Sequence, residues 1–171
     1  MKKDIIILTG DGKGKTTTAL GFTIDAISKG KKVFIGQFLK NGDYSEIKTL
    51  KKFLKYVTIE QYGSGRFIKN ALSKDDINQG KKGYKKIKEI LEEKKHELVI
   101  LDEGNLALYY KIFSLEDLLE LFKIKSDNTT LIITGRNALK ETMVNADKVI
   151  RMDEVKHYFK KGVQARVGIE K

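Results

Sequence analysis

The chain has 171 residues, no cysteine and a formal net charge of +11 at pH 7. Its length suits one domain with a full hydrophobic core, residues 1–171. The absence of cysteine excludes disulfide bonds and thiolate metal sites, and it agrees with a reducing cytoplasm. No stretch approaches the roughly 20 apolar residues of a membrane span. We therefore expect a cytoplasmic protein with no membrane partner.

The positive charge allows two interpretations. Much of it comes from lysines scattered over an expected helix face, such as Lys81, Lys82 and Lys85, and this distribution is typical of a solubilising surface. Nucleic acid is not expected as a partner, because the alternation of aromatic and basic residues typical of single-strand binding does not occur. The charge still favours small polyanionic ligands.

Short apolar runs alternate with longer segments of helical period along the chain. The runs are residues 5–8, 33–35, 57–59, 98–101, 131–133 and 149–150. Continuous apolar runs indicate strands buried on both faces, hence a parallel sheet covered by helices. Helices are expected over residues 15–29, with Gly30 at the end, over about 74–95, and after a cap at Ser114. We predict a three-layer α/β/α fold of the P-loop, RecA-like kind, with a mainly parallel sheet of about six strands.

A glycine-rich turn separates the first expected strand from the first expected helix. It reads Gly10, Asp11, Gly12, Lys13, Gly14, Lys15, Thr16 and Thr17. Glycines let the backbone curl so that successive N–H groups point at phosphate oxygens, and the helix adds its positive dipole end. Lys15 would add a full charge and Thr16 a hydroxyl for Mg²⁺. The sequence therefore predicts a cradle for the phosphates of ATP.

This loop departs from the usual G-x-x-x-x-G-K-[ST] pattern. Thr9 stands where the first glycine belongs, and Gly10 makes a shorter G-x-x-x-G-K-T. The nucleotide could therefore lie differently from its position in ordinary nucleotide hydrolases. Thr17 is a second hydroxyl that could either contact phosphate or pack the helix.

An acidic pair, Asp102 and Glu103, follows the apolar run 98–101. Carboxylates at the end of a buried strand form a Walker B arrangement, which would place Asp102 near a metal ion at Thr16. A helix cap or a surface carboxylate is the alternative for either residue. Glu103 could also serve as a base or as a second metal ligand.

Further motifs follow in a fixed order. They are Gln-Phe-Leu-Lys at 37–40, Leu-Asp-Glu-Gly-Asn at 101–105, Thr-Gly-Arg at 134–136, Val-Lys-His at 155–157 and Gly-Val-Gln-Ala-Arg-Val-Gly-Ile-Glu at 162–170. With the glycine loop, in this order and spacing, they resemble the ATP:corrinoid adenosyltransferases of the CobA/CobO/BtuR type. The resemblance extends from about residue 5 to residue 170.

The resemblance implies an enzyme that transfers the 5′-deoxyadenosyl group of ATP to the cobalt(I) of a reduced corrinoid and releases triphosphate. It also implies Mg²⁺ or Mn²⁺, a homodimer, a flavoprotein reductant and a role in making or salvaging adenosylcobalamin. In such enzymes the nucleotide lies reversed in the loop. Cobalt(I) is itself the nucleophile, so the reaction needs no general base. Lys15, Glu103 and Arg136 are the catalytic candidates. Lys15 would stabilise the departing triphosphate, and Arg136 could either do the same or form only a surface ion pair.

Three further residues are candidates for ligand binding, each with an alternative. Lys40 could contact a phosphate or a corrin side chain, or it could be solvated. Asn105 could hydrogen-bond a ligand or cap the next segment. Members of the family carry a phenylalanine and a tryptophan after the third strand, whereas this chain has Phe67 in that region and no tryptophan. Phe67, or Tyr62 in its place, could be an apolar wedge beneath the corrin, or Phe67 could be part of the core.

Two other activities compete with adenosyl transfer. One is a RecA-like P-loop NTPase acting on nucleic acid, and the other is a small-molecule P-loop kinase. The scarcity of arginine, with Arg66, Arg136, Arg151 and Arg166 in the chain, argues against both a kinase lid and bidentate recognition of nucleic-acid phosphates.

Overall fold

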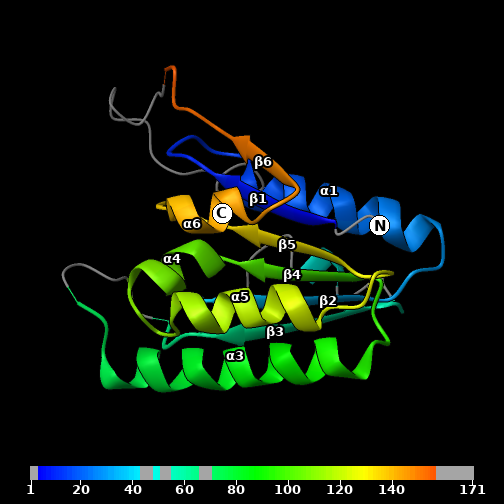
Figure 1. Ribbon diagram of the computed structural model, residues 1–171, viewed down its shortest axis with the longest axis horizontal. Helices are drawn as coiled ribbons and strands as arrows, with labels where there is room; N and C mark the ends of the chain where they lie inside the picture. Colours follow the sequence, from blue (N-terminus) through cyan, green and yellow to red (C-terminus); the bar gives the residue numbers. More distant parts are fainter. Residues whose placement is uncertain (1–3, 43–47, 51–54, 66–70, 157–171) are drawn as a thin grey trace.

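The computed structural model describes residues 4–42, 48–50, 55–65 and 71–156. Within these residues the chain forms a parallel sheet in the order β3-β2-β4-β5-β1-β6. The strands are β1 (Ile5–Thr9), β2 (Val33–Phe38), β3 (Val57–Tyr62), β4 (Leu98–Asp102), β5 (Thr130–Thr134) and β6 (Lys148–Arg151). Each predicted strand is present, and the α/β fold is confirmed (Figure 1).

Helices cover both faces of the sheet. They are α1 (Lys15–Ser28), α3 (Lys74–Glu93), α4 (Gly104–Tyr109), α5 (Leu115–Ile124) and α6 (Lys140–Val144). Successive side chains of a strand point to opposite faces. Accordingly Ile5 and Ile7 of β1 lie in the core cluster beneath α3 and α5, whereas Ile6 and Leu8 pack with Ala19 of α1 on the other face.

Local sequence signals explain where the longer helices begin and end. Ser73 and Ser114 cap α3 and α5, and in each case an aspartate at the third helical position completes a capping box. Gly30 follows α1 with a φ of 70°, a left-handed conformation that glycine adopts readily. These three predicted helices are confirmed, but the sequence did not predict α4 and α6, which are only six and five residues long.

The strand order brings the predicted motifs to one edge of the sheet. The neighbouring strands β2, β4, β5 and β1 are all parallel, so their carboxyl ends lie together (Figure 1). Ligands of open α/β sheets bind at such an edge. No helix within the described residues is both long and apolar enough to span a lipid bilayer.

Candidate active site

The glycine loop runs from the end of β1 to the start of α1. Gly10 and Gly14 have φ values of 98° and 108°, a region that residues with a side chain rarely adopt. Gly12 donates its N–H to the carbonyl of Met152 at 2.8 Å. A Cβ atom on Gly12 would lie 2.8 Å from that same oxygen. The glycines are therefore needed both for the curl of the loop and for its close contact with the segment that follows β6.

The side chain of Lys15 lies against the inside of the loop. Its ammonium donates to the carbonyls of Gly10 and Gly12 at 2.7 and 2.6 Å, and the residue is only 9 % exposed. Burial lowers the pKa of Lys15, partly offset by the negative charge of Glu103. Gly14 caps α1 without any side-chain hydrogen bond. A buried cation therefore lies at the N-terminus of α1, the positive end of the helix dipole, and this combination suits an anion.

Asp102 lies opposite the loop at the end of β4 and is 1 % exposed. Its Oδ1 accepts hydrogen bonds from Thr16 at 2.9 Å and Thr134 at 2.7 Å. Its Oδ2 accepts from the Gln37 amide at 2.9 Å and the Lys40 ammonium at 2.8 Å. Burial alone would raise the pKa of Asp102, but Lys40 and the hydroxyl donors outweigh it and hold the pKa below its ordinary value. Asp102 is therefore a carboxylate at neutral pH.

Glu103 follows in a left-handed conformation with a φ of 58°. Its N–H donates to the Thr134 hydroxyl at 3.0 Å. Within the described part of the chain, no hydrogen bond or ion pair holds its carboxylate, which faces Gly135. Burial and the neighbouring Asp102 raise the pKa of Glu103. The two acidic residues therefore differ: Asp102 is fully hydrogen-bonded, whereas the Glu103 carboxylate remains available to a ligand.

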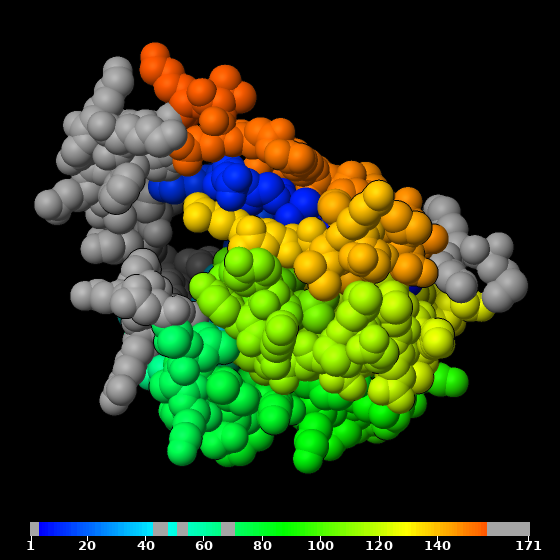
Figure 2. All heavy atoms as spheres, turned by 60° about the vertical axis from the view of Figure 1, so that its left-hand side comes forward, coloured from blue at the N-terminus to red at the C-terminus, as the bar shows by residue number. Residues whose placement is uncertain are grey.

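Arg136 places a second positive charge beside the loop. It follows β5, is exposed, and donates from Nη2 to the carbonyl of Asp11 at 3.4 Å. Its charge lowers the pKa of Lys15, after the larger effects of burial and Glu103. Figure 2 turns this edge of the sheet toward the viewer, with the blue N-terminal segments above the yellow segments of β5 and α6 and the green ones below these.

Asn105 is fully buried in α4. Its Nδ2 donates to the carbonyls of Leu8 at 3.4 Å and Gly135 at 3.1 Å, and its Oδ1 is buried without a partner within the described residues. Asn105 therefore ties the end of β1 to the turn after β5, beneath the loop. This geometry favours a positioning role over direct contact with a ligand.

The other predicted residues divide into two groups. Asp11 and Lys13 lie on the loop and Thr17 lies in the first turn of α1, and all three have exposed side chains. Phe67 lies outside the described residues, as do Arg66 and the motif at 162–170.

Sequence reasoning left two buried polar residues without a role. Thr134 and Gln37 are both 0 % exposed and donate to Asp102. Their sequence signal was a polar residue inside or at the end of an otherwise apolar strand. Gln37 in turn accepts a hydrogen bond from Gln61 of β3 at 2.9 Å. Three strands thus contribute to the support of a single carboxylate.

An apolar cavity of about 470 Å³ lies between the end of α4 and the start of α5. None of the predicted site residues lines it. Its lining residues are Leu108, Tyr109, Lys111, Ile112, Phe113, Ser114, Leu115, Asp117 and Leu139.

The glycine loop lies between β1 and α1, and the Lys15 ammonium bridges two of its carbonyls. The next residue, Thr16, donates its hydroxyl to the Asp102 carboxylate at the end of β4. This arrangement defines a P-loop nucleotide-binding protein. Comparison with known proteins narrows this class. The model of the family described as ATP:corrinoid adenosyltransferase BtuR/CobO/CobP matches residues 2–170. The chain belongs to this family.

Curated relatives agree with the family assignment. A corrinoid adenosyltransferase of Sinorhizobium is 30 % identical over 169 residues, covering 97 % of this chain and 79 % of the relative. Those of Escherichia coli K12 and Pseudomonas aeruginosa are 31 % and 30 % identical, covering 97 % of this chain in each case and 84 % and 82 % of the relatives. Family membership favours adenosyl transfer over the hydrolase and kinase alternatives.

Proposed function

We propose that this chain transfers the 5′-deoxyadenosyl group of ATP to the cobalt(I) of a corrinoid, with the glycine loop holding the triphosphate. ATP and a corrinoid are the substrates of the family. The observation that carries the assignment of the loop is the Lys15 ammonium, held 2.6–2.7 Å from two loop carbonyls at the start of α1. A polyphosphate entering the loop would take over this buried cation.

For this reaction the protein must position the two substrates and stabilise the charge that develops on the leaving group. A bond forms between cobalt and C5′ of the ribose, while the bond from C5′ to the phosphate oxygen breaks and its electron pair leaves with triphosphate. Lys15, the loop amides and Arg136 stabilise the charge that gathers on the leaving group. The corrinoid supplies the nucleophile, so Glu103 is not needed as a general base. The remaining catalysis comes from holding C5′ in line with cobalt.

The oxygen donors at the loop fit a hard divalent cation. Thr16 offers a hydroxyl, and Asp102 and Glu103 offer carboxylates. The described residues contain no cluster of three or more histidine, cysteine, aspartate or glutamate side chains suited to a metal. Mg²⁺ is commonly held by one or two carboxylates together with water and substrate phosphates. We assign Thr16, Asp102 and Glu103 to Mg²⁺ or Mn²⁺, which would neutralise part of the triphosphate charge.

The same proposal includes the remaining implications of the family resemblance. These are a homodimer, a flavoprotein reductant that supplies cobalt(I), a cytoplasmic location and Phe67 as an apolar wedge beneath the corrin. Asn105 acts through the loop rather than by touching the ligand. Light scattering of the purified chain would test the dimer directly, since a monomeric mass at micromolar concentration would contradict it.

The products of the reaction test the proposed function. The purified protein is mixed with ATP, Mg²⁺ and chemically reduced cobalamin, and both the visible spectrum and the released phosphate species are followed. Triphosphate formed in step with the alkylcobalamin spectrum supports adenosyl transfer. Orthophosphate or a phosphorylated acceptor in place of triphosphate would support one of the two competing activities.

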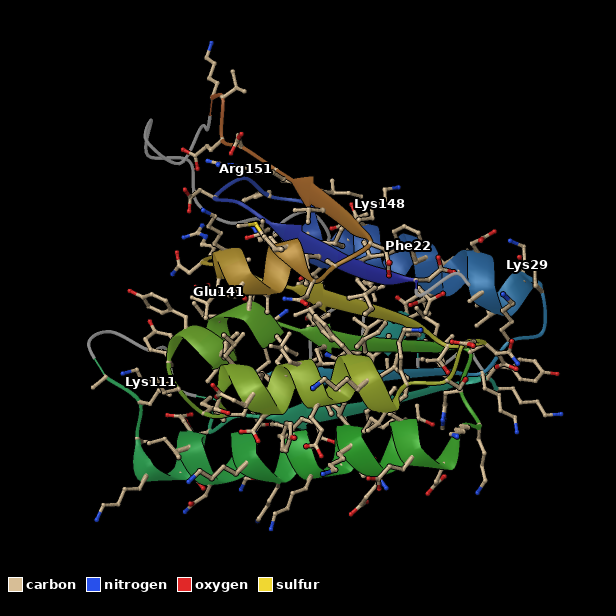
Figure 3. All side chains as sticks on the ribbon, in the orientation of Figure 1. Phe22, Lys29, Lys111, Glu141, Lys148 and Arg151 are labelled. Carbon is tan, nitrogen blue, oxygen red and sulfur yellow. The ribbon has the colours of Figure 1, made fainter. Side chains whose placement is uncertain are left out.

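A variant tests the role of the loop lysine. We expect Lys15→Ala to lower the rate of triphosphate release by about 10²–10³, the usual effect of losing one transition-state donor. Lys29→Ala is the matched control because Lys29 is exposed at the opposite end of α1, as Figure 3 shows. Retention of most activity by Lys15→Ala would remove Lys15 from the mechanism.

A further inference from the structure

The carboxylate of Asp102 is saturated with hydrogen-bond donors. Oδ1 accepts from Thr16 and Thr134 at 2.9 and 2.7 Å, and Oδ2 accepts from Gln37 and Lys40 at 2.9 and 2.8 Å. A carboxylate offers about four lone-pair sites in total. A metal ion, or a water molecule bound to it, can therefore reach Asp102 only after one of these donors has left.

The four donors differ in their freedom to leave. Thr134 and Gln37 are 0 % exposed on β5 and β2. Thr16 need not leave, because a hydroxyl can donate its proton to Asp102 and still offer an oxygen lone pair to a metal. Lys40 has a side chain that is 18 % exposed on a flexible stem, and its positive charge is repelled by an arriving cation. Lys40 is the donor that can be displaced.

The main chain at Lys40 is fixed, so displacement would move only its side chain. Leu39 has a φ of 56° and donates its N–H to the carbonyl of Tyr62 at 2.9 Å. A Cβ on Gly63 would lie 2.6 Å from the main-chain nitrogen of Lys40. The turn after β2 is thus packed against the end of β3, and the mobile part of Lys40 is its four-carbon stem.

We propose that Lys40 is an internal cation that compensates the Asp102 carboxylate until the divalent metal binds and then leaves Asp102. This inference rests on the proposed metal site at Thr16 and Asp102. Before the metal binds, the positive charge of Lys40 neutralises a buried carboxylate charge that would otherwise have no counter-charge beside it. After displacement its ammonium lies at the same sheet edge as the phosphate loop, where the triphosphate can accept it.

Mn²⁺ alone, without nucleotide, is the probe for the test. Free Mn²⁺ is measured by electron paramagnetic resonance in titrations of the full chain and of Lys40→Met. We expect Lys40→Met to bind Mn²⁺ about tenfold more tightly or better, because a competing charge is gone. Lys29→Met is the matched control: it removes a lysine paired with Asp25 at the same 2.8 Å, far from the site. Unchanged or weaker binding by Lys40→Met would overturn the proposal.

Two further measurements separate the possible failures. Asp102→Asn should weaken Mn²⁺ binding at least tenfold; if it does not, the metal assignment fails and the lysine proposal fails with it. If Asp102→Asn weakens binding but Lys40→Met does not strengthen it, only the lysine proposal fails.

In the wild-type chain, the rate at which Lys40 is acetylated, measured by mass spectrometry, should rise when Mg²⁺ is added. Equal acetylation rates with and without Mg²⁺ would contradict displacement even if Lys40→Met did not fold.

Discussion

Asp76 fastens both ends of the segment that joins β3 to α3. Its Oδ1 accepts the N–H of Ser64 at 3.0 Å, just after β3. Its Oδ2 accepts the N–H and the hydroxyl of Ser73, the cap of α3, at 3.0 and 2.6 Å. Asp76 is 4 % exposed. The substitution Asp76→Asn keeps the shape of the side chain but turns one acceptor into a donor that faces other donors.

The pKa of Asp76 gives the size of the expected effect. Burial acts to raise the pKa, but the hydrogen bonds from Ser64 and Ser73 outweigh it and bring it from 3.8 to about 2. A carboxylate whose pKa falls on folding stabilises the folded state above its unfolded pKa, and this contribution is lost as the pH falls toward the folded pKa. The difference between these two pKa values corresponds to about 2.5 kcal/mol of folding stability at pH 7, and about half of this contribution is lost by pH 3.

Urea unfolding followed by circular dichroism at several pH values between 7 and 3 tests this reasoning. Asp76→Asn should lower the free energy of unfolding by about 2–3 kcal/mol at pH 7, and the difference from wild type should shrink as the pH approaches 3. Asp75→Asn is the control, because Asp75 is exposed in the same first turn and should change stability by less than about 0.5 kcal/mol. An Asp76→Asn deficit that does not vary with pH would refute the link between the carboxylate and stability.

Two further variants probe the loop and the support of Asp102. Thr134→Val removes a hydroxyl that donates to Asp102 and accepts from the Glu103 N–H, so we expect a loss of about 1–3 kcal/mol in urea unfolding; a neutral result would mean that other groups replace both bonds. Gly12→Ala would place a Cβ 2.8 Å from the Met152 carbonyl, so we expect weaker ATP binding by calorimetry, whereas wild-type affinity would show that the loop and the segment after β6 can separate freely.

The sequence predicted the fold well because its strands are continuous apolar runs and its longer helices have clear caps. The short helices escaped prediction for a physical reason. The N-cap of α4 is Glu103, which takes a left-handed conformation without a side-chain cap, and the N-cap of α6 is Leu139, whose side chain cannot cap. Tertiary packing rather than local sequence decides such segments.

The sequence predicted the main motifs of the candidate site but not the hydrogen bonds among its residues. The glycine loop and the acidic pair are local patterns, and each lies where its pattern indicated. That four donors meet at Asp102 depends on the order of β2, β4 and β5 and on their register, which a single sequence does not reveal. For the same reason the sequence left open whether Asn105 contacts a ligand or caps the next segment; in the structure its Nδ2 donates to two main-chain carbonyls.

The position of β1 has a consequence for how the protein is made. Among the described strands the first, β1, lies between the last two, β5 and β6. A nascent chain leaving the ribosome therefore carries the apolar residues of β1 without either neighbour until nearly all of the described sheet has been synthesised. Pairings between such distant segments form slowly and leave apolar surface open to aggregation meanwhile. A chaperone that shields β1 as it is synthesised would protect the strand from which the glycine loop later extends.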